Sequence, residues 1–348
     1  MMSRPYRFVA IAAALLVASA SAAHAALILQ PLTSFGNNGW LAPADATYLQ
    51  GANVQRGMTY NQLNNRVYVV DRNGGNFIRV LNGDTGALVS SLDMTGVSGG
   101  TFPINMIDVD DQGVIYAANL VVGGTLTIYR WANEAAAPTI AFNGATNRTR
   151  TGDSFAVIGS GASTQIVSAG GTGAGETYAL FSTADGLTYT VSNPAAAGAP
   201  NGAFRLGIDF AGPGTVLGKA TSNNLFSNPT AGGSATGAAL TSAGEGPIAY
   251  DAVDALLASI DVNSNLVRLY DAANLAAPAL LDDENLTTAF VANTNGVGDL
   301  KFGRVNGQLR LYAMNTNNGI QAFVVVPEPA GALLGLLGLA AVARFRRV

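Results

Sequence analysis

The sequence predicts an all-β protein, a six-bladed β-propeller closed by its N-terminal strand. Glycine is abundant, at 42 of 348 residues, and charged residues make up only 11%, against roughly 25% in an average soluble domain. Short apolar segments recur at intervals of about 50 residues, as in propeller blades. A further apolar stretch, residues 27–35, precedes the first repeat. Seven blades and a β-sandwich are the alternatives.

The first 25 residues have the three parts of a secretory signal peptide. Arg4 and Arg7 supply the positive start, residues 8–18 form an apolar run, and Ala23-His24-Ala25 offers small residues at a cleavage site. The run is short for a permanent helix across about 30 Å of hydrocarbon. We therefore expect export, with cleavage by a signal peptidase after Ala25.

The predicted propeller body spans residues 26–326. Its repeat is marked by apolar residues that follow Gly- or Pro-rich breaks, namely Met58, Met106, Phe155, Leu206, Ile248 and Leu300. Within a unit a short strand precedes a second strand ending in Asp or Asn, a Gly/Asn turn and a third strand. This order resembles that of NHL and quinoprotein-like propellers, and it implies a fold but no activity. Residues 159–176 and 228–246 are rich in Gly, Ala, Ser and Thr and fit either loops or strands.

The sixth unit lacks a fourth strand, because Pro327 ends it after the third. The stretch 27–35 can supply that outer strand, and an edge strand tolerates Pro31. We expect it to pair with residues 319–326 and close the ring.

Residues 327–348 form a tail with three parts. Pro327-Glu328-Pro329 is stiff and extended, because each proline fixes its own φ and restricts the residue before it. The apolar run 330–343 is expected to form one short transmembrane helix. An arginine cluster at 344–347 follows and is expected to stay cytoplasmic by the positive-inside rule; its members are Arg344, Arg346 and Arg347.

This tail resembles the PEP-CTERM sorting signal of Gram-negative bacteria, the substrate of exosortases. The resemblance covers residues 326–348. It implies transient anchoring in the inner membrane with the body in the periplasm, processing near Pro327, Glu328 and Pro329, and release to the cell surface or extracellular matrix. A short tail anchor with an incidental Pro-Glu-Pro is the alternative.

Composition excludes several chemistries. The chain has no cysteine, and its one histidine, His24, lies in the predicted signal peptide. A mature chain lacking both cannot form Ser-His-Asp or Cys-His nucleophiles, His-ligated zinc, or His- or Cys-ligated haem. Five of the 18 basic residues lie at the two ends, which leaves 13 in the body against 21 acidic residues. Nucleic acid is therefore not an expected partner.

The candidate metal site is the acidic turn from Asp108 to Gly113. Asp108, Asp110 and Asp111 place three carboxylates in a short segment, and calcium prefers oxygen ligands. The terminal glutamate of a full EF-hand loop is missing. The same string is typical of a hairpin between the first two strands of a blade, which is the preferred interpretation, without a cofactor.

These features predict an exported surface or matrix protein, not an enzyme, whose propeller binds or displays extracellular polysaccharide or surface proteins. The alternative is a secreted hydrolase or lyase that uses carboxylates and an oxygen-ligated divalent cation. An enzyme should gather acidic or amide side chains at one end of the channel, and a binding module should show an aromatic face. Aromatic residues recur at matching positions, which favours packing; they are Tyr60, Tyr116, Trp131, Tyr250 and Tyr270.

Overall fold

The computed structural model describes residues 27–50 and 53–328. The predicted signal peptide with Ala25, and the tail from Pro329 onward with its apolar run and Arg344, Arg346 and Arg347, lie outside these residues. Among the described residues, no helix has the length and apolar character needed to cross a membrane.

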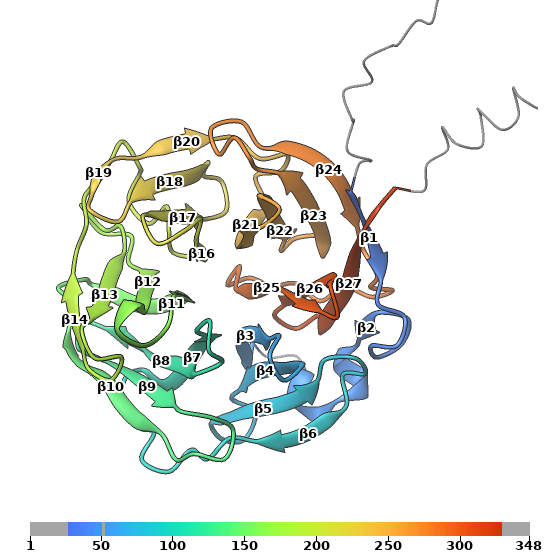
Figure 1. Cartoon of the computed structure of the whole chain (residues 1–348), viewed down its shortest axis with the longest axis horizontal. Helices are drawn as coiled ribbons and strands as arrows, with labels where there is room; N and C mark the ends of the chain where they lie inside the picture. The colour runs from blue at the N-terminus through green and yellow to red at the C-terminus, as the bar shows by residue number, and fades with distance from the viewer. Residues whose placement is uncertain (1–26, 51–52, 329–348) are drawn as a thin grey trace, which may run out of the picture. The chain divides into compact units, whose positions relative to one another are not determined.

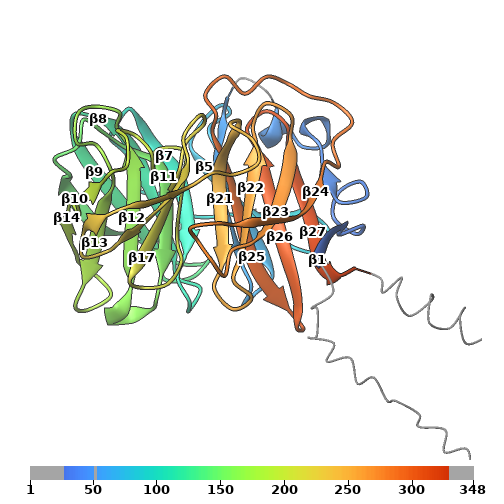
Figure 2. The same ribbon diagram turned by 90° about the horizontal axis from the view of Figure 1, so that it is seen from above.

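The body, Leu27–Val326, is built from β-strands and short 3-10 helices, which confirms the all-β prediction. Four-stranded antiparallel units follow one another around a central axis (Figure 1). Seen from the side, the strands run roughly along that axis (Figure 2). The 3-10 helices are η1 (Pro43–Asp45), η2 (Thr47–Leu49) and η3 (Gly161–Ser163).

Within each unit the strands are ordered from the axis outward. The earlier units are β3 (Gln55–Asn61), β4 (Arg66–Asp71), β5 (Phe77–Asn82) and β6 (Leu88–Ser91); β7 (Phe102–Val109), β8 (Ile115–Val122), β9 (Thr125–Trp131) and β10 (Thr139–Ala145); and β11 (Arg150–Ile158), β12 (Gln165–Gly170), β13 (Ala179–Thr183) and β14 (Tyr189–Ser192). The later units are β16 (Gly207–Phe210), β17 (Thr215–Lys219), β18 (Leu225–Pro229) and β20 (Thr236–Ala238); β21 (Glu245–Asp251), β22 (Leu256–Asp261), β23 (Leu266–Asp271) and β24 (Ala279–Glu284); and β25 (Gly298–Val305), β26 (Gln308–Asn315), β27 (Ile320–Pro327) and β1 (Leu27–Pro31). Short strands add to this plan: β2 (Trp40–Leu41) pairs with β27, and β15 (Ala196–Ala197) pairs with β19 (Gly233–Ser234).

The hairpin turns explain the richness in Gly and Asn. Asn65 (φ 55°) turns the chain between β3 and β4, Gly113 (φ 79°) between β7 and β8, and Asn265 (φ 63°) between β22 and β23. Left-handed backbone costs least in Gly and Asn. The abundance of Gly and Asn therefore reflects the many tight turns of the fold.

The repeat landmarks fall on the innermost strands, with Leu206 one residue before β16. The segment 159–176, which fitted loop or strand, contains β12, whose last five residues are buried. Its small side chains suit a strand that is covered on both faces by neighbouring units. The segment 228–246 holds the short outer strands β19 and β20.

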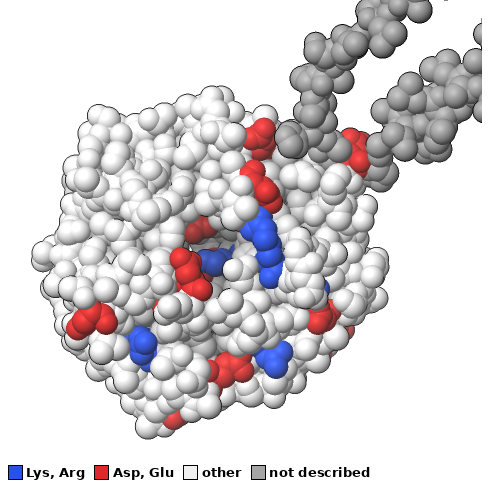
Figure 3. Space-filling view, viewed as in Figure 1, with Lys and Arg blue, Asp and Glu red and all other residues white. Residues whose placement is uncertain are grey.

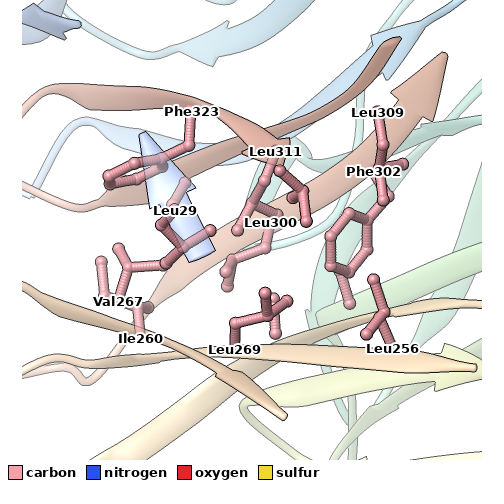
Figure 4. Close-up of a cluster of buried hydrophobic side chains, with 14 of the residues drawn as sticks. Leu29, Leu256, Ile260, Val267, Leu269, Leu300, Phe302, Leu309, Leu311 and Phe323 are labelled. Carbon is pink, nitrogen blue, oxygen red and sulfur yellow. The ribbon is translucent and has the colours of Figure 1, made fainter. Parts of the chain in front are cut away.

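The N-terminal strand β1 lies beside β27. The Leu32 amide donates to the Ala322 carbonyl at 2.9 Å, and the Leu29 amide donates to Asp282 Oδ2 of β24 at 2.7 Å. The Leu29 side chain is 2% exposed and packs with Val267 and Phe323 (Figure 4). The first strand of the body thus joins its last strand to the preceding unit.

Candidate functional site

The innermost strands β3, β7, β11, β16, β21 and β25 lie around the central axis (Figure 1), and their side chains line a channel. Residues from the starts of these strands line one mouth of the channel, and residues from their ends line the other. Between the mouths the free volume is only about 10 Å³, room for one water at most. Side chains including Met58, Phe155 and Ile248 fill this part of the channel. A ligand at one mouth therefore cannot reach the other through the channel.

A charged cluster occupies the middle of the channel. Lys301 Nζ lies 2.7 Å from Asp108 Oδ2. Burial alone would lower the pKa of Lys301, but the carboxylates of Asp108, Asp209 and Asp299 together raise it above its usual range. Burial also raises the pKa of Asp209 to about 6 and that of Asp299 well above its usual range. We call Asp108, Asp209, Asp299 and Lys301 the channel core.

Each carboxylate of the channel core joins neighbouring units. Asp108 Oδ2 accepts the Val157 amide of β11 at 2.8 Å, Asp209 Oδ2 accepts the Tyr250 amide of β21 at 2.7 Å, and Asp299 Oδ2 accepts the Met58 amide of β3 at 3.0 Å. The bonds thus connect β7 to β11, β16 to β21, and β25 to β3. These carboxylates hold the inner strands of successive units together.

The structure places the residues of the predicted calcium site in different surroundings. Asp108 Oδ1 accepts bonds from Thr59 Oγ1 and the Val109 amide, and Lys301 provides the cation at Oδ2. Asp110 Oδ1 accepts the amides of Gln112 and Val114, and so closes the hairpin between β7 and β8. Asp111 is exposed, and its amide donates to the Gly159 carbonyl. Across residues 27–50 and 53–328, no group of three or more His, Cys, Asp or Glu side chains gathers as metal ligands.

The mouth at the ends of the inner strands, which we call the aspartate mouth, is a cavity of about 230 Å³. Its lining includes Asp110, Asp111, Asp209, Asp251 and Arg304. Arg304 holds Asp251 through two bonds of 2.6 and 2.8 Å. On the face seen in Figure 3, acidic and basic side chains border the hollow at the centre of the ring. Ion pairing therefore uses much of the charge at this mouth.

The mouth at the starts of the inner strands is larger, about 710 Å³. Its charged lining consists of Arg56, Arg150, Arg205 and Asp153, and we call it the arginine mouth. Asp153 is 8% exposed and is held by Arg150 through Nε to Oδ2 and through Nη2 to Oδ1, the latter at 2.7 Å. Asn105 also lines this mouth. This mouth brings together charged and amide side chains that sequence reasoning did not single out.

Irregular strand register accompanies these side chains. The pairing shifts between Gln55 and Met58 on β3, between Phe102 and Met106 on β7, and between Thr151 and Ser154 on β11. Arg56, Asn105 and Asp153 fall within these three irregularities. Bulges redirect side chains and are common next to active sites. The sequence signal is weak, because a polar residue just before an apolar strand is common.

The aromatic residues that recur at matching positions serve mainly in packing, as expected. Tyr60, Tyr116, Trp131 and Tyr270 are at most 2% exposed. Tyr250 is partly buried and lines the aspartate mouth with Tyr60. The larger, arginine mouth contains the single aromatic residue Phe102 among its described lining residues. It is not an aromatic binding face.

No protein-family model and no curated protein matches the sequence. Solved structures do resemble the fold. A DUF4623 family protein from Bacteroides eggerthii has a TM-score of 0.63 at 16% identity, over 82% of this chain and 74% of its own. A gluconolactonase from Xanthomonas campestris has a TM-score of 0.51 at 14% identity, over 85% of this chain and 92% of its own. Regucalcin from Agrobacterium tumefaciens, described as a calcium-binding protein, has a TM-score of 0.53 at 13% identity, over 80% of this chain and 93% of its own.

These likenesses establish a propeller-like fold and correct one prediction. The prediction that the chain is not an enzyme is wrong, because a fold that extends over most of this chain also serves a gluconolactonase. The body from residue 26 onward has neither His nor Cys, which leaves hydrolysis by carboxylates available.

Proposed function

We propose that this protein is a hydrolase that acts on a small polar substrate at the arginine mouth. A cavity of about 710 Å³ lies within the range of roughly 300–1,000 Å³ that is usual for small-molecule sites. The observation that carries the proposal is Asp153, the one acidic side chain among the described residues lining this mouth. Its position within a strand irregularity and its ion pair with Arg150 fix the carboxylate in the cavity wall.

Hydrolysis of an ester or lactone fits these groups. Asp153 accepts a proton from water as the water oxygen attacks the carbonyl carbon. The carbon–oxygen bond to the leaving group then breaks, and the proton passes to the departing alkoxide. Arg150 orients the carboxylate and places positive charge near the developing oxyanion. Guanidinium groups around one ion-paired carboxylate do not suit a divalent cation, so no step uses calcium.

Replacing Asp153 tests the proposal directly. Asp153→Asn should lower the hydrolysis of reactive members of a panel of lactones and esters by about 100-fold or more, since a positioned base contributes roughly 10²–10⁴-fold. Asp93→Asn, on an exposed loop, is the matched control and should keep the wild-type rate. A wild-type protein inactive on the whole panel, or an unaffected Asp153→Asn, would contradict the proposal.

We infer that the four-stranded units are the blades of a six-bladed propeller, with β1 as the outer strand of the last blade. The sheet order β1-β27-β26-β25 supports this count. So do the bonds of the channel core, which join inner strands of successive units around the axis.

We also propose that the chain is exported and processed by an exosortase, as the two terminal segments predict. Pro327 and Glu328 support accessibility, because both are exposed where β27 ends. The substrate would then be met in the periplasm or outside the cell.

A further inference from the structure

We propose that the arginine mouth binds a sugar acid, a polyhydroxylated molecule bearing a carboxylate, and that Arg56 pairs with that carboxylate. This inference rests on the proposed function in taking this mouth as the substrate site. It concerns recognition rather than turnover, so binding measurements test it independently.

The arginine mouth is positively charged, whereas the body as a whole is acidic. Arg56, Arg150 and Arg205 line the cavity, with Asp153 opposing them. Arg72 lies behind the wall, where its guanidinium stacks on the Phe102 ring at 3.7 Å. The body as a whole carries 13 basic and 21 acidic residues. Four arginines around one carboxylate therefore make a local positive field within an acidic body, which attracts an anion.

Arg56 is a buried charged group that lacks a partner. It is only 9% exposed, yet its side chain has no hydrogen-bond or ion-pair partner among residues 27–50 and 53–328, and its Nε is buried. Burial lowers the pKa of Arg56, the charge of Asp153 opposes that shift and Arg150 adds to it. A buried charge without a partner is costly. A ligand carboxylate in the cavity would remove this cost through two parallel N–H···O bonds.

Two of its arginine neighbours are already engaged. Arg150 is paired with Asp153, with 2.7 Å between Nη2 and Oδ1. Arg72 donates to Asn105 Oδ1 at 3.0 Å and to the Asn53 carbonyl at 3.1 Å. The burial of Arg72 and the nearby charge of Arg56 lower its pKa to about 10. Arg56 is therefore the buried guanidinium with free capacity. The Arg205 side chain also has no hydrogen-bond or ion-pair partner within the described part of the chain, but it is only partly buried. The arginines around Arg56 add long-range attraction.

The remaining lining points to a sugar rather than a small inorganic anion. Exposed hydroxyl and amide groups border the cavity, from Thr149, Thr172, Thr294 and Asn295. Such groups can both donate and accept hydrogen bonds, as sugar hydroxyls require. The cavity of about 710 Å³ is also far larger than a sulfate or phosphate ion needs.

Calorimetric titration of the full body with glucuronate, glucose and sulfate tests the proposal. Glucuronate should bind the wild type at least about 10-fold more tightly than either glucose or sulfate. The reason is that the charge-assisted bonds to its carboxylate and the hydrogen bonds to its hydroxyl groups both contribute to the free energy of binding. Equal affinity for glucose would overturn the role of the carboxylate. Equal affinity for sulfate would overturn recognition of the sugar, and binding of none of the three would overturn both.

Arg56 variants locate the site. Arg56→Met should weaken glucuronate binding by about 10- to 100-fold and leave the weak binding of glucose unchanged. The affinity of Arg56→Lys for glucuronate should lie between those of the wild type and Arg56→Met, because lysine keeps the charge but cannot form two parallel hydrogen bonds to a carboxylate. Arg130→Met is the matched control, since the Arg130 Nε is also buried without a partner but lies outside the mouth. Unchanged glucuronate binding by a folded Arg56→Met would contradict the proposal.

Turnover and binding can fail separately. Asp153→Asn that binds glucuronate but hydrolyses nothing would leave both proposals standing. A wild type that binds glucuronate through Arg56 but hydrolyses no lactone or ester would defeat the proposed function alone. Hydrolysis that needs Asp153 but is indifferent to Arg56 and to a substrate carboxylate would defeat this inference alone.

Discussion

At the scale of single residues, the channel core decides how the middle of the ring is stabilised. One ammonium group, Lys301, neutralises part of the charge of Asp108, Asp209 and Asp299. The carboxylates remain tolerable because each also accepts a backbone amide of the next unit. The cluster is thus a structural cross-link, and the cation position beside Asp108 is already filled by the chain itself.

Removing the ammonium group should destabilise the fold. Lys301→Met leaves Asp108, whose side chain is 2% exposed, without its cation. We expect a loss of about 3 kcal/mol in the free energy of unfolding, the lower end for breaking a buried pair. Urea unfolding measures it, and Lys301→Met combined with Asp108→Asn should recover part of the loss. A single variant as stable as the wild type would show that the cluster contributes nothing to stability.

The raised pKa of Asp209 predicts a pH dependence with a definite sign. Its pKa is about 6 in the folded protein and roughly 3.9 unfolded, so the folded state holds the extra proton between these values. Stability from this group is therefore gained as pH falls from about 7 to 4, and lost as pH rises. Relative to Asp209→Asn, the wild type should gain about 2–3 kcal/mol over that range. Denaturant unfolding at several pH values checks this, and a constant difference would contradict the assignment.

At the scale of strands and hairpins, the sequence predicted the order of the strands better than the direction in which individual side chains point. The apolar landmarks other than Leu206 fall on inner strands, since burial against neighbouring units demands apolar residues there. Arg56, Asn105 and Asp153 were missed because irregular register breaks the period of two on which sequence reading depends. Asp108 was grouped with Asp110 for nearness in sequence, but it ends in the channel while Asp110 caps a hairpin.

The closing strand provides a test at the same scale. Leu29 on β1 is 2% exposed among Val267, Leu311 and Phe323. Leu29→Ala should cost about 2–4 kcal/mol of unfolding free energy, the usual range for a buried leucine. Leu88→Ala on the outer strand β6 is the control, because Leu88 is 51% exposed and its loss should cost under about 0.5 kcal/mol. Thermal or urea unfolding compares the two, and equal effects would mean that β1 does not clasp the ring.

At the scale of the whole molecule, composition limits chemistry and the ring supplies the geometry. A body without His or Cys must build its site from carboxylates, amides and guanidinium groups, and the arginine mouth is made of these. The sequence could predict this restriction but not the place, because the residues of the mouth come from strands about 50 positions apart. The filled channel between the mouths allows one end to bind a ligand while the other remains structural.

Processing at Pro327-Glu328-Pro329 is expected to be the route by which the body leaves the membrane. Replacing Pro327, Glu328 and Pro329 by alanine should leave full-length protein in the membrane fraction of a host that has an exosortase. The reason is that the apolar run 330–343 and the arginines after it would still hold the chain in the membrane, while the recognition segment is gone. Immunoblots of membrane and medium fractions measure the outcome.

The body itself should fold normally in this variant, because Pro327 and Glu328 are exposed and lie beyond the buried part of β27. Binding of glucuronate by the retained protein, solubilised in detergent, therefore serves as the control for folding. Release into the medium at the wild-type level would contradict the sorting assignment and leave a simple tail anchor, or cleavage elsewhere, as the explanation. Retention with intact binding would separate the two proposed functions of the chain, delivery directed by the tail and recognition of a sugar acid by the arginine mouth.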